Sequence, residues 1–182
     1  MKTIVVVDYD PGWAAVFEEL RARIWPVVRD VAISIEHVGS TAVPGLAAKP
    51  VVDISVVVPT AATVPTGITR LASLGYRHRG NLGVADRDAF VAPGSLPSHH
   101  LYLCPADSLA LRNHLAVRDY LRTHPQAAGE YGTLKKQLAG RFAHDIEGYV
   151  AGKTDTILAI LRRTGFAAHE LEKIEHLNRR AV

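Results

Sequence analysis

The pattern of hydrophobic and polar positions divides the chain into a first part rich in strands and a second part made of helices. In the first part, the β-branched run at 51–58 is typical of a buried strand, because branched side chains pack well on a pleated surface. Ile33 and Ile35 predict a strand before it, and a short apolar run at 3–7 predicts another. The segment 99–104 predicts a further strand, whose side chains alternate between the two faces of the sheet.

Two helices are expected among these strands. Asp10 followed by Pro11 is a start signal for the first, since a capping residue precedes a proline at the first helical position. One face of this helix is apolar at helical spacing: Trp13, Val16, Phe17, Leu20 and Ile24. Pro26 is expected to end or kink it. Residues 68–74 predict the second helix, closed by Gly75.

After residue 105 the pattern changes to the helical period. Helices are predicted for four segments, each with an apolar stripe: 107–123, 125–142, 145–163 and 166–180. The last of them packs either on the domain or on a partner chain. The predicted fold class is therefore α+β, in a single domain over 1–182 with an α/β core at 1–105 and a helical part at 106–182.

Each of the first three helices after residue 105 carries one cation inside its apolar stripe. These are Arg118, Lys135 and Lys153. Burying a charge without a partner is costly, so these side chains either reach water, pair with Asp119 and Glu130, or meet anions. If the helices pack near the turn described next, the three cations line a basic pocket suited to phosphates or carboxylates.

A turn with small and hydroxyl residues joins the two central strands. Gly39 permits unusual dihedral angles, and Ser40 and Thr41 offer hydroxyls beside exposed backbone N–H groups, which is a way to hold a phosphate. Lys49 adds positive charge, and Asp53 is a candidate ligand of Mg²⁺. The alternative is an ordinary turn, with Asp53 as a cap.

Composition excludes several classes of protein. The chain has 182 residues, 48% hydrophobic and 21% charged, which is enough for a sizeable core. The formal net charge of +3 is small, and no block of basic residues indicates a nucleic-acid surface. No apolar run is long enough to span a membrane and no cleavable signal pattern is evident, so a cytoplasmic location is expected. The lone Cys104 is expected to be a buried thiol.

Other chemical motifs are absent. The histidines lack zinc-ligand spacing, and the chain has no Walker-type loop, dinucleotide fingerprint or serine nucleophile elbow. Residues 86–88 contain two carboxylates but are expected to form a surface turn, because glycines and an asparagine surround them.

The central segment 37–54, which reads HVGSTAVPGLAAKPVVDI, resembles the signature of the GrpB-like family of bacterial proteins. Later segments are similar to that family's other landmarks: 117–122 with 124–125, Tyr131 with 134–135, and Tyr149 with Lys153. The resemblance covers nearly the whole chain up to about residue 161. The family is placed in the nucleotidyltransferase fold typified by DNA polymerase beta, whose pattern is a Gly-Ser turn followed by Asp-x-Asp or Asp-x-Glu on a strand.

The resemblance implies roles for the central residues and also exposes a departure. It implies that Ser40 and the turn hold phosphates and that Asp53 holds Mg²⁺. Active members of the fold carry a second carboxylate two residues later, where this chain has Ser55. Because two-metal phosphoryl transfer needs carboxylates to hold both ions, Glu36 or His100 is the candidate replacement.

Three further candidates come from the same stretch and from the helices. In a strand the adjacent histidines His99 and His100 point to opposite faces, so only one can face a site on the sheet, and we choose His100 because the family has a His-containing strand here. His37 and Tyr131 belong to matched segments and are candidates for the site as well.

Two hypotheses of function follow. The first is a nucleotidyltransferase-like enzyme that binds a nucleoside triphosphate and Mg²⁺ in the cleft at Gly39, Ser40 and Asp53. The second is a non-catalytic nucleotide-binding or protein-interaction domain, since domains resembling GrpB occur fused to dephospho-coenzyme A kinase. Ser55 favours the second hypothesis. The expected partner is a nucleotide or another small phosphorylated ligand; no membrane is expected, and the oligomeric state is left open.

Overall fold

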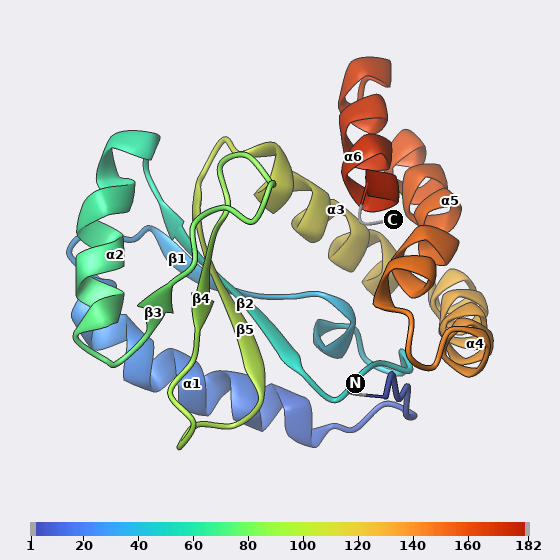
Figure 1. Ribbon diagram of the computed structural model, residues 1–182, viewed down its shortest axis with the longest axis horizontal. Coiled ribbons are helices and arrows are strands. Elements are labelled where there is room, and N and C mark those ends of the chain that lie inside the picture. Colours follow the sequence, from blue (N-terminus) through green and yellow to red (C-terminus); the bar gives the residue numbers. More distant parts are fainter. Residues whose placement is uncertain (1–2, 181–182) are drawn as a thin grey trace.

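The computed structural model describes residues 3–180 and contains a mixed sheet flanked by helices (Figure 1). The sheet has five strands in the order β1-β2-β5-β4-β3. Their bounds are β1 Ser34–Val38, β2 Val52–Val58, β3 Arg77–His78, β4 Asp88–Val91 and β5 His99–Pro105. The central pair, β2 and β5, is parallel, and the other pairs are antiparallel. The predicted α+β class with a mixed sheet is confirmed.

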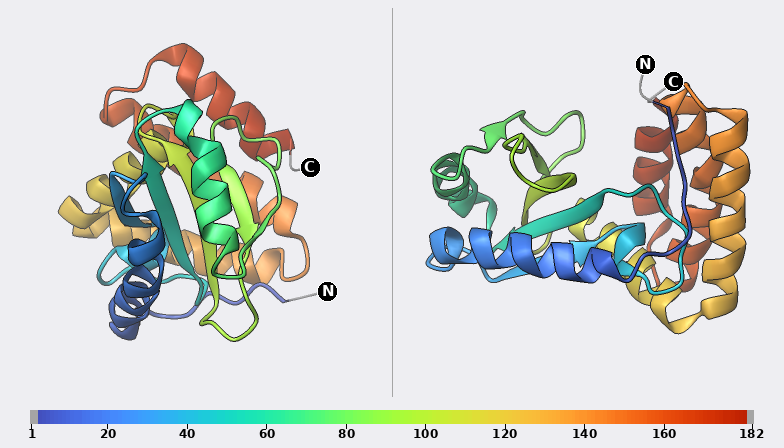
Figure 2. Two further views of the ribbon diagram at one scale, coloured as in Figure 1. Left: turned by 90° about the vertical axis from the view of Figure 1, so that its left-hand side faces the viewer. Right: turned by 90° about the horizontal axis from the view of Figure 1, so that it is seen from below.

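Two helices cover one face of the sheet. They are α1 (Gly12–Val28) and α2 (Val64–Ala72), and they lie on the same side of the sheet in Figure 2. The largest hydrophobic core forms between them and the sheet, and its fully buried members include Leu20, Ile24, Val28, Ile54, Val56, Leu71 and Leu103. This packing leaves the opposite face of β1, β2 and β5 for the site.

The remaining helices form a layer at one end of the sheet. Helix α3 (Leu109–Thr123) begins against the sheet, where Leu111 packs on Val57 and Cys104. It leads to α4 (Pro125–Arg141), α5 (Ile146–Arg163) and α6 (Ala168–Arg180), which stand together in Figures 1 and 2. A capping hydroxyl starts α3, because Ser108 Oγ accepts a hydrogen bond from the backbone N–H of Leu111.

A separate apolar cluster fixes the chain that follows β1 to this helical layer. Val43 and Leu46 lie against Leu121 of α3, Tyr131 of α4 and Ile160 of α5. The Gly-Ser turn therefore lies next to the helices that carry the three predicted cations.

Several predictions about the first part of the chain are wrong in detail. Residues 3–7 form no strand: Val7 makes one bridge to Ala48, and Ile4 packs beside α4 and α5 instead of in the sheet. Ile33 is 56% exposed and lies before β1. Helix α1 continues past Pro26 to its end two residues later, so the proline removes a backbone hydrogen bond only from the last turn.

Helix α2 also differs from its prediction. It begins at Val64 and contains Gly67 in its interior. A Cβ on Gly67 would lie 2.8 Å from Leu103 of β5, so the glycine lets α2 pack closely on the sheet and does not break the helix. At the far end, Gly75 has the positive φ (+85°) expected of a residue that follows a helix.

Two more predictions need correction. Ile146, placed in the apolar stripe of α5, is 50% exposed. Residues 86–88 are only partly a turn, because Asp86 has a positive φ of 56° while Asp88 begins β4. By contrast, the prediction for Cys104 is confirmed, because its side chain is buried. Within the described residues, no helix is both long enough and apolar enough to cross a membrane.

Candidate functional site

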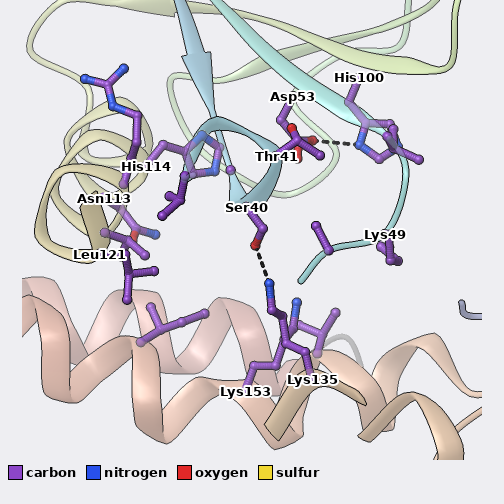
Figure 3. A pocket seen from close by; sticks show the side chains of 18 of the residues that line it. Ser40, Thr41, Lys49, Asp53, His100, Asn113, His114, Leu121, Lys135 and Lys153 are labelled. Carbon is purple, nitrogen blue, oxygen red and sulfur yellow. Dashed lines mark hydrogen bonds and ion pairs between the residues drawn. The ribbon is translucent and has the colours of Figure 1, made fainter. Parts of the chain in front are cut away.

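Asp53 and His100 lie side by side on the site face of the sheet. In the pairing of β2 with β5, Asp53 is opposite His100, and the two side chains meet with His100 Nδ1 2.8 Å from Asp53 Oδ1 (Figure 3). His99 points to the other face, where its Nε2 lies 2.7 Å from the hydroxyl of Tyr76 and its Nδ1 lies 2.7 Å from the carbonyl oxygen of Pro97. Of the two adjacent histidines, His100 is therefore the one at Asp53.

Gly39 allows the turn after β1 to approach Asp53. Its φ is +71°, and a Cβ built on it would lie 2.4 Å from Asp53 Oδ2. No other residue fits this position without strain, because both the dihedral angle and the space exclude a side chain. The short helix η1 (Ser40–Ala42) follows at once and sets the Ser40 hydroxyl at the mouth of the cleft.

Three lysine amines gather opposite this turn. Lys135 of α4 is 2% exposed and donates a hydrogen bond from Nζ to Ser40 Oγ at 2.8 Å (Figure 3). Its Nζ lies 4.8 Å from the ring centre of Tyr131. Lys153 of α5 and Lys49 both approach the ring of Tyr149, with Nζ 4.5 Å and 5.7 Å from its centre.

This lysine cluster, Lys49, Lys135 and Lys153, has no carboxylate within ion-pair distance among the described residues. Burial, reinforced by the neighbouring charge of Lys153, lowers the pKa of Lys135 to about 7. Burial, reinforced by Lys49, lowers the pKa of Lys153 to about 8. An anion placed among the amines would favour their charged forms and reverse both shifts.

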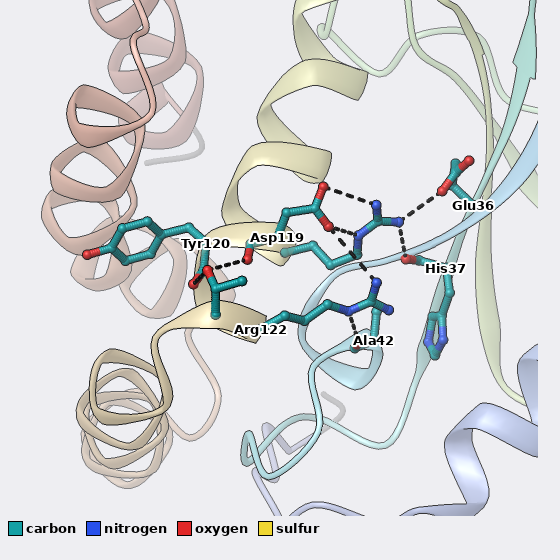
Figure 4. A network of polar contacts seen from close by, with 8 residues as sticks. Glu36, His37, Ala42, Asp119, Tyr120 and Arg122 are labelled. Carbon is teal, nitrogen blue, oxygen red and sulfur yellow. Dashed lines mark hydrogen bonds and ion pairs between the residues drawn. The ribbon is translucent and has the colours of Figure 1, made fainter.

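Arg118, which we expected to join this pocket, has carboxylate partners. Its Nη1 donates to Glu36 Oε2 at 2.9 Å and to the carbonyl of His37 at 3.1 Å, and its Nε donates to Asp119 Oδ1 at 2.7 Å (Figure 4). The predicted pairing with Asp119 is therefore present. Arg118 still lines the cleft, but its charge is balanced and it joins α3 to β1.

Arg122 belongs to the same network and was missed. One helical turn after Arg118, its Nε donates to the carbonyl of Ala42 at 2.9 Å, so it holds the end of η1. The signal was available in the sequence, since positions 118 and 122 share a helix face. We name this group, Glu36, Arg118, Asp119 and Arg122, the arginine network.

The side chains of His37 and Thr41 contact each other. The ring of His37 stacks on Phe17 at 4.7 Å, and its Nε2 lies 3.0 Å from Thr41 Oγ1. Both residues are buried, and burial lowers the pKa of His37 to about 4, so the imidazole is neutral at pH 7. The Thr41 hydroxyl, expected at a phosphate, instead fixes the turn.

The residues do not fit a two-metal centre. Ser55, which replaces the second carboxylate of the fold pattern, is fully buried, and its Oγ has no partner among the described residues. Glu36 lies opposite Ser55 on β1, but Arg118 holds its carboxylate. In the same part of the chain, no group of three or more His, Cys, Asp or Glu side chains gathers as metal ligands do. Asp53 is the single carboxylate left for a cation.

These side chains line a cleft of about 350 Å³ between the sheet and the helices. It brings together Gly39, Ser40, Thr41, Lys49, Asp53, His100, Arg118, Tyr131, Lys135 and Lys153. Several polar lining residues were missed, among them Arg87, Tyr102, Asn113, His114 and Asn178. Tyr102 could have been found, because residues 100 and 102 of a strand point to the same face of the sheet. Arg87 could not, because its turn gives no hint that the guanidinium lies 4.6 Å from the Tyr102 ring centre.

Comparison with known proteins identifies the family. The family model described as GrpB protein matches residues 3–163. The chain belongs to the GrpB family. A crystal structure of GrpB from Enterococcus faecalis is 33% identical, with a TM-score of 0.77, covering 93% of this chain and 98% of that one.

Curated relatives of this GrpB-family chain differ in length. UPF0157 protein YqkA of Bacillus subtilis is 35% identical over 156 residues, which are 86% of this chain but 46% of that protein. UPF0157 protein BH1888 of Halalkalibacterium halodurans is 31% identical over 164 residues, 88% of this chain and 82% of that protein. The chain thus spans about half the length of the first relative and most of the second.

More distant solved structures share the fold. The GLD-2/RNP-8 complex has a TM-score of 0.54 at 12% identity, over 80% of this chain and 59% of that one. A Cid1 poly(U) polymerase mutant bound to MgATP has a TM-score of 0.53 at 14% identity, over 74% of this chain and 45% of that one. At such identities the likeness shows the fold alone, which is nucleotidyltransferase-like, as the resemblance to the GrpB family implied.

Proposed function

We propose that this GrpB-family chain binds the phosphate groups of a nucleotide in the cleft between the sheet and the helical layer. The observation that carries the proposal is the lysine cluster, whose three amines line one cleft without a carboxylate within ion-pair distance among the described residues; Lys135 bonds Ser40, and Lys49 and Lys153 lie at the ring of Tyr149. Such a group of buried and half-buried positive charges is unfavourable alone and becomes favourable with an anion that carries several charged oxygens.

The surroundings of the cluster suit a polyphosphate. The rings of Tyr131 and Tyr149 shield the amines from water on one side, which strengthens their attraction for an anion. The Ser40 hydroxyl, which accepts the hydrogen bond of Lys135, is free to donate its own proton to a phosphate oxygen. Three amines match the several negative charges of a nucleoside triphosphate better than the one charge of a carboxylate, and the hydroxyl adds a hydrogen-bond donor.

Mg²⁺ is not required for this binding, because the cleft offers Asp53 as a single carboxylate in place of a two-metal clamp. The proposal therefore assigns charge neutralisation to the lysines. Titrations with and without Mg²⁺ distinguish this from metal-dependent binding.

A second candidate function, nucleotidyl transfer, is favoured by the Asp53–His100 pair. Asp53 holds the Nδ1 side of a His100 ring whose side chain is 51% exposed, so Nε2 is placed to accept a proton from an acceptor hydroxyl. The oxygen of that hydroxyl would attack the α-phosphorus while pyrophosphate leaves. Pyrophosphate release by the parent that is lost in His100→Gln, with unchanged nucleotide affinity, supports transfer; binding without release supports a binding domain.

An accessory role is consistent with the binding proposal. A Mycolicibacterium paratuberculosis protein named dephospho-CoA kinase is 29% identical over 177 residues, which are 42% of its length. For the present chain, this relative supports a nucleotide-handling context and does not specify a reaction.

The binding proposal is tested by isothermal titration calorimetry with inorganic triphosphate and with ATP, GTP, CTP and UTP. Lys135→Met is expected to weaken triphosphate binding at least tenfold, the loss of one desolvated charge contact. Lys136→Met is the matched control, since Lys136 lies next in α4, is 45% exposed and pairs with Asp8 outside the cleft. Absence of binding by the parent, or equal losses in both variants, overturns the proposal.

A further inference from the structure

A second cavity adjoins the cleft. It has a volume of about 380 Å³ and lies between the loop before β4, the first half of α3, and α6. Four residues line both cavities, namely Arg87, Asn113, His114 and Asn178, so the two spaces adjoin at these residues. Figure 3 shows Asn113 and His114 on the wall of the first cavity.

The walls of the second cavity differ from those of the first. Most of its exposed surface is apolar and includes Val84, Leu109, Ala110, Ile174 and Leu177. Asp86, Lys173 and His176 also line it, so charges of both signs stand at its walls. The lysine cluster does not reach it. An uncharged, mostly apolar group fits this space better than a second phosphate does.

Polar groups without partners mark the boundary between the two cavities. Arg87 Nε and His114 Nδ1 are buried and have no hydrogen-bond partner among the described residues. Burial lowers the pKa of His114 to about 4, so at pH 7 its ring is neutral, with one donor and one acceptor nitrogen. Asn113 and Asn178 each add an amide, with a carbonyl acceptor and an NH₂ donor. Buried polar atoms without partners are costly, and a ligand with complementary atoms would satisfy them.

We propose that the second cavity receives the nucleobase of the nucleotide whose phosphates lie at the lysine cluster, a step that rests on the proposed function. A nucleobase combines flat apolar faces with an edge of donors and acceptors, and a side-chain amide can pair with such an edge through two hydrogen bonds. The apolar walls contact the faces, and the boundary groups contact the edge. One ligand thus begins at Ser40 and ends beyond Asn178.

The proposal makes α6 the element that sets base preference. The family model ends at residue 163, whereas α6 begins at Ala168 and supplies Ile174, Leu177 and Asn178 to the two cavities. Family members with another C-terminal segment would keep the phosphate site and differ in the base they accept.

The test compares nucleotides with inorganic triphosphate in variants of the second cavity. Asn178→Leu keeps the size of the side chain and removes the amide. It is expected to weaken the parent's best-bound nucleoside triphosphate about tenfold, to reduce the differences among the four bases, and to change triphosphate affinity by less than about twofold. Glu172→Leu is the control, because Glu172 is exposed on the same helix and lines neither cavity.

A second variant covers the case in which Asn178→Leu does not fold. Ala85→Trp places a large ring at an exposed loop position that lines the second cavity, so it should block base binding without disturbing the core. Retained triphosphate binding with loss of base preference in either variant supports the proposal. Equal effects on triphosphate and nucleotides, or no effect on either, overturn it while the phosphate site stands. A parent that binds neither ligand overturns the proposed function and this inference together.

Discussion

Two groups of basic residues lie around the turn after β1 in opposite electrostatic conditions. The arginine network is balanced, because Arg118 contacts the carboxylates of Glu36 and Asp119. The lysine cluster is unbalanced: Lys135 donates to the Ser40 hydroxyl and lies over an aromatic ring, and residues 3–180 place no carboxylate in ion-pair distance of it. The same sequence signal, a cation in an apolar helical stripe, thus produces a structural connection at one end of the cleft and a candidate ligand site at the other.

Because of this difference, removing a cation should affect the stability of the protein in one group and ligand binding in the other. Removing a cation from the balanced group leaves carboxylates without partners and should cost stability. Removing a cation from the unbalanced group relieves repulsion and should cost binding. The following variants test this contrast in order of expected effect.

Gly39→Ala should have the largest effect, because the turn it begins serves both groups. A Cβ here would collide with the Asp53 carboxylate, and φ is +71°. We expect a loss of about 3 kcal/mol in the free energy of unfolding. Urea denaturation measures it. Gly140→Ala is the control, since a Cβ there has no atom within 4 Å; equal stabilities of the two variants would refute the tight approach at Asp53.

Arg118→Met should cost about 2 kcal/mol of stability, since it leaves Glu36 and Asp119 without their shared partner. Triphosphate affinity should change little, because Arg118 is already neutralised. The control is Arg21→Met, whose ion pair with Glu18 is exposed on both sides and should contribute less than about 1 kcal/mol. A loss of triphosphate binding without a loss of stability would place Arg118 in the anion site instead.

Lys135→Met should act in the opposite direction on stability. At pH 7 the ligand-free variant is expected to be more stable than the parent by about 1 kcal/mol, because a buried charge without a carboxylate partner is removed. Thermal and urea unfolding without ligand measure this. Marked destabilisation would show that the amine is well satisfied in the ligand-free protein.

The pH dependence of stability should follow from the same lysines. In the unfolded chain they stay protonated up to their ordinary pKa of 10.5, whereas in the folded protein Lys135 and Lys153 lose protons near pH 7 and 8. Between the folded-state and the unfolded-state pKa values the unfolded chain binds more protons than the folded protein. The destabilisation that the two lysines cause therefore decreases, and the free energy of unfolding rises, as pH increases from about 7 to 10.

The measurable consequence is that the difference in free energy of unfolding between Lys135→Met and the parent decreases with pH. The stability advantage of Lys135→Met over the parent should shrink with rising pH, by less than about 1.4 kcal/mol per pH unit for one proton. Urea titrations at pH 7, 8 and 9 measure it. A constant difference over this range would mean that Lys135 keeps its ordinary pKa.

The sequence predicts the elements that depend on local pattern. The central strands and the helices after residue 105 follow from periodicities that each segment carries by itself. Periodicity also puts His99 and His100 on opposite faces, but the choice of His100 came from the family resemblance. The strand predicted at 3–7 and the helix start predicted at residue 68 are wrong because tertiary contacts decide there: Ile4 packs beside α4 and α5, and Gly67, inside α2, packs against Leu103.

The candidate site could be predicted only in part. The cations in the helical stripes pointed to Lys135 and Lys153, the turn pointed to Ser40 and Lys49, and the structure places these residues around one cleft. The pairing of Arg118 with Asp119 was predicted, but its second partner could not be found from sequence, because Glu36 lies 82 positions away. The second cavity could not be predicted from the sequence either, since it forms where the loop before β4, α3 and α6 meet.

The most direct test of the account is the pKa of Lys135, measured by NMR of isotope-labelled lysine side chains with and without inorganic triphosphate. Lys135 is expected to titrate near pH 7 in the free protein and to return toward 10.5 when triphosphate binds. A Lys135 that titrates near its ordinary pKa in the free protein, or that does not respond to triphosphate, would contradict the claim that the cluster is an unbalanced site for a phosphate ligand.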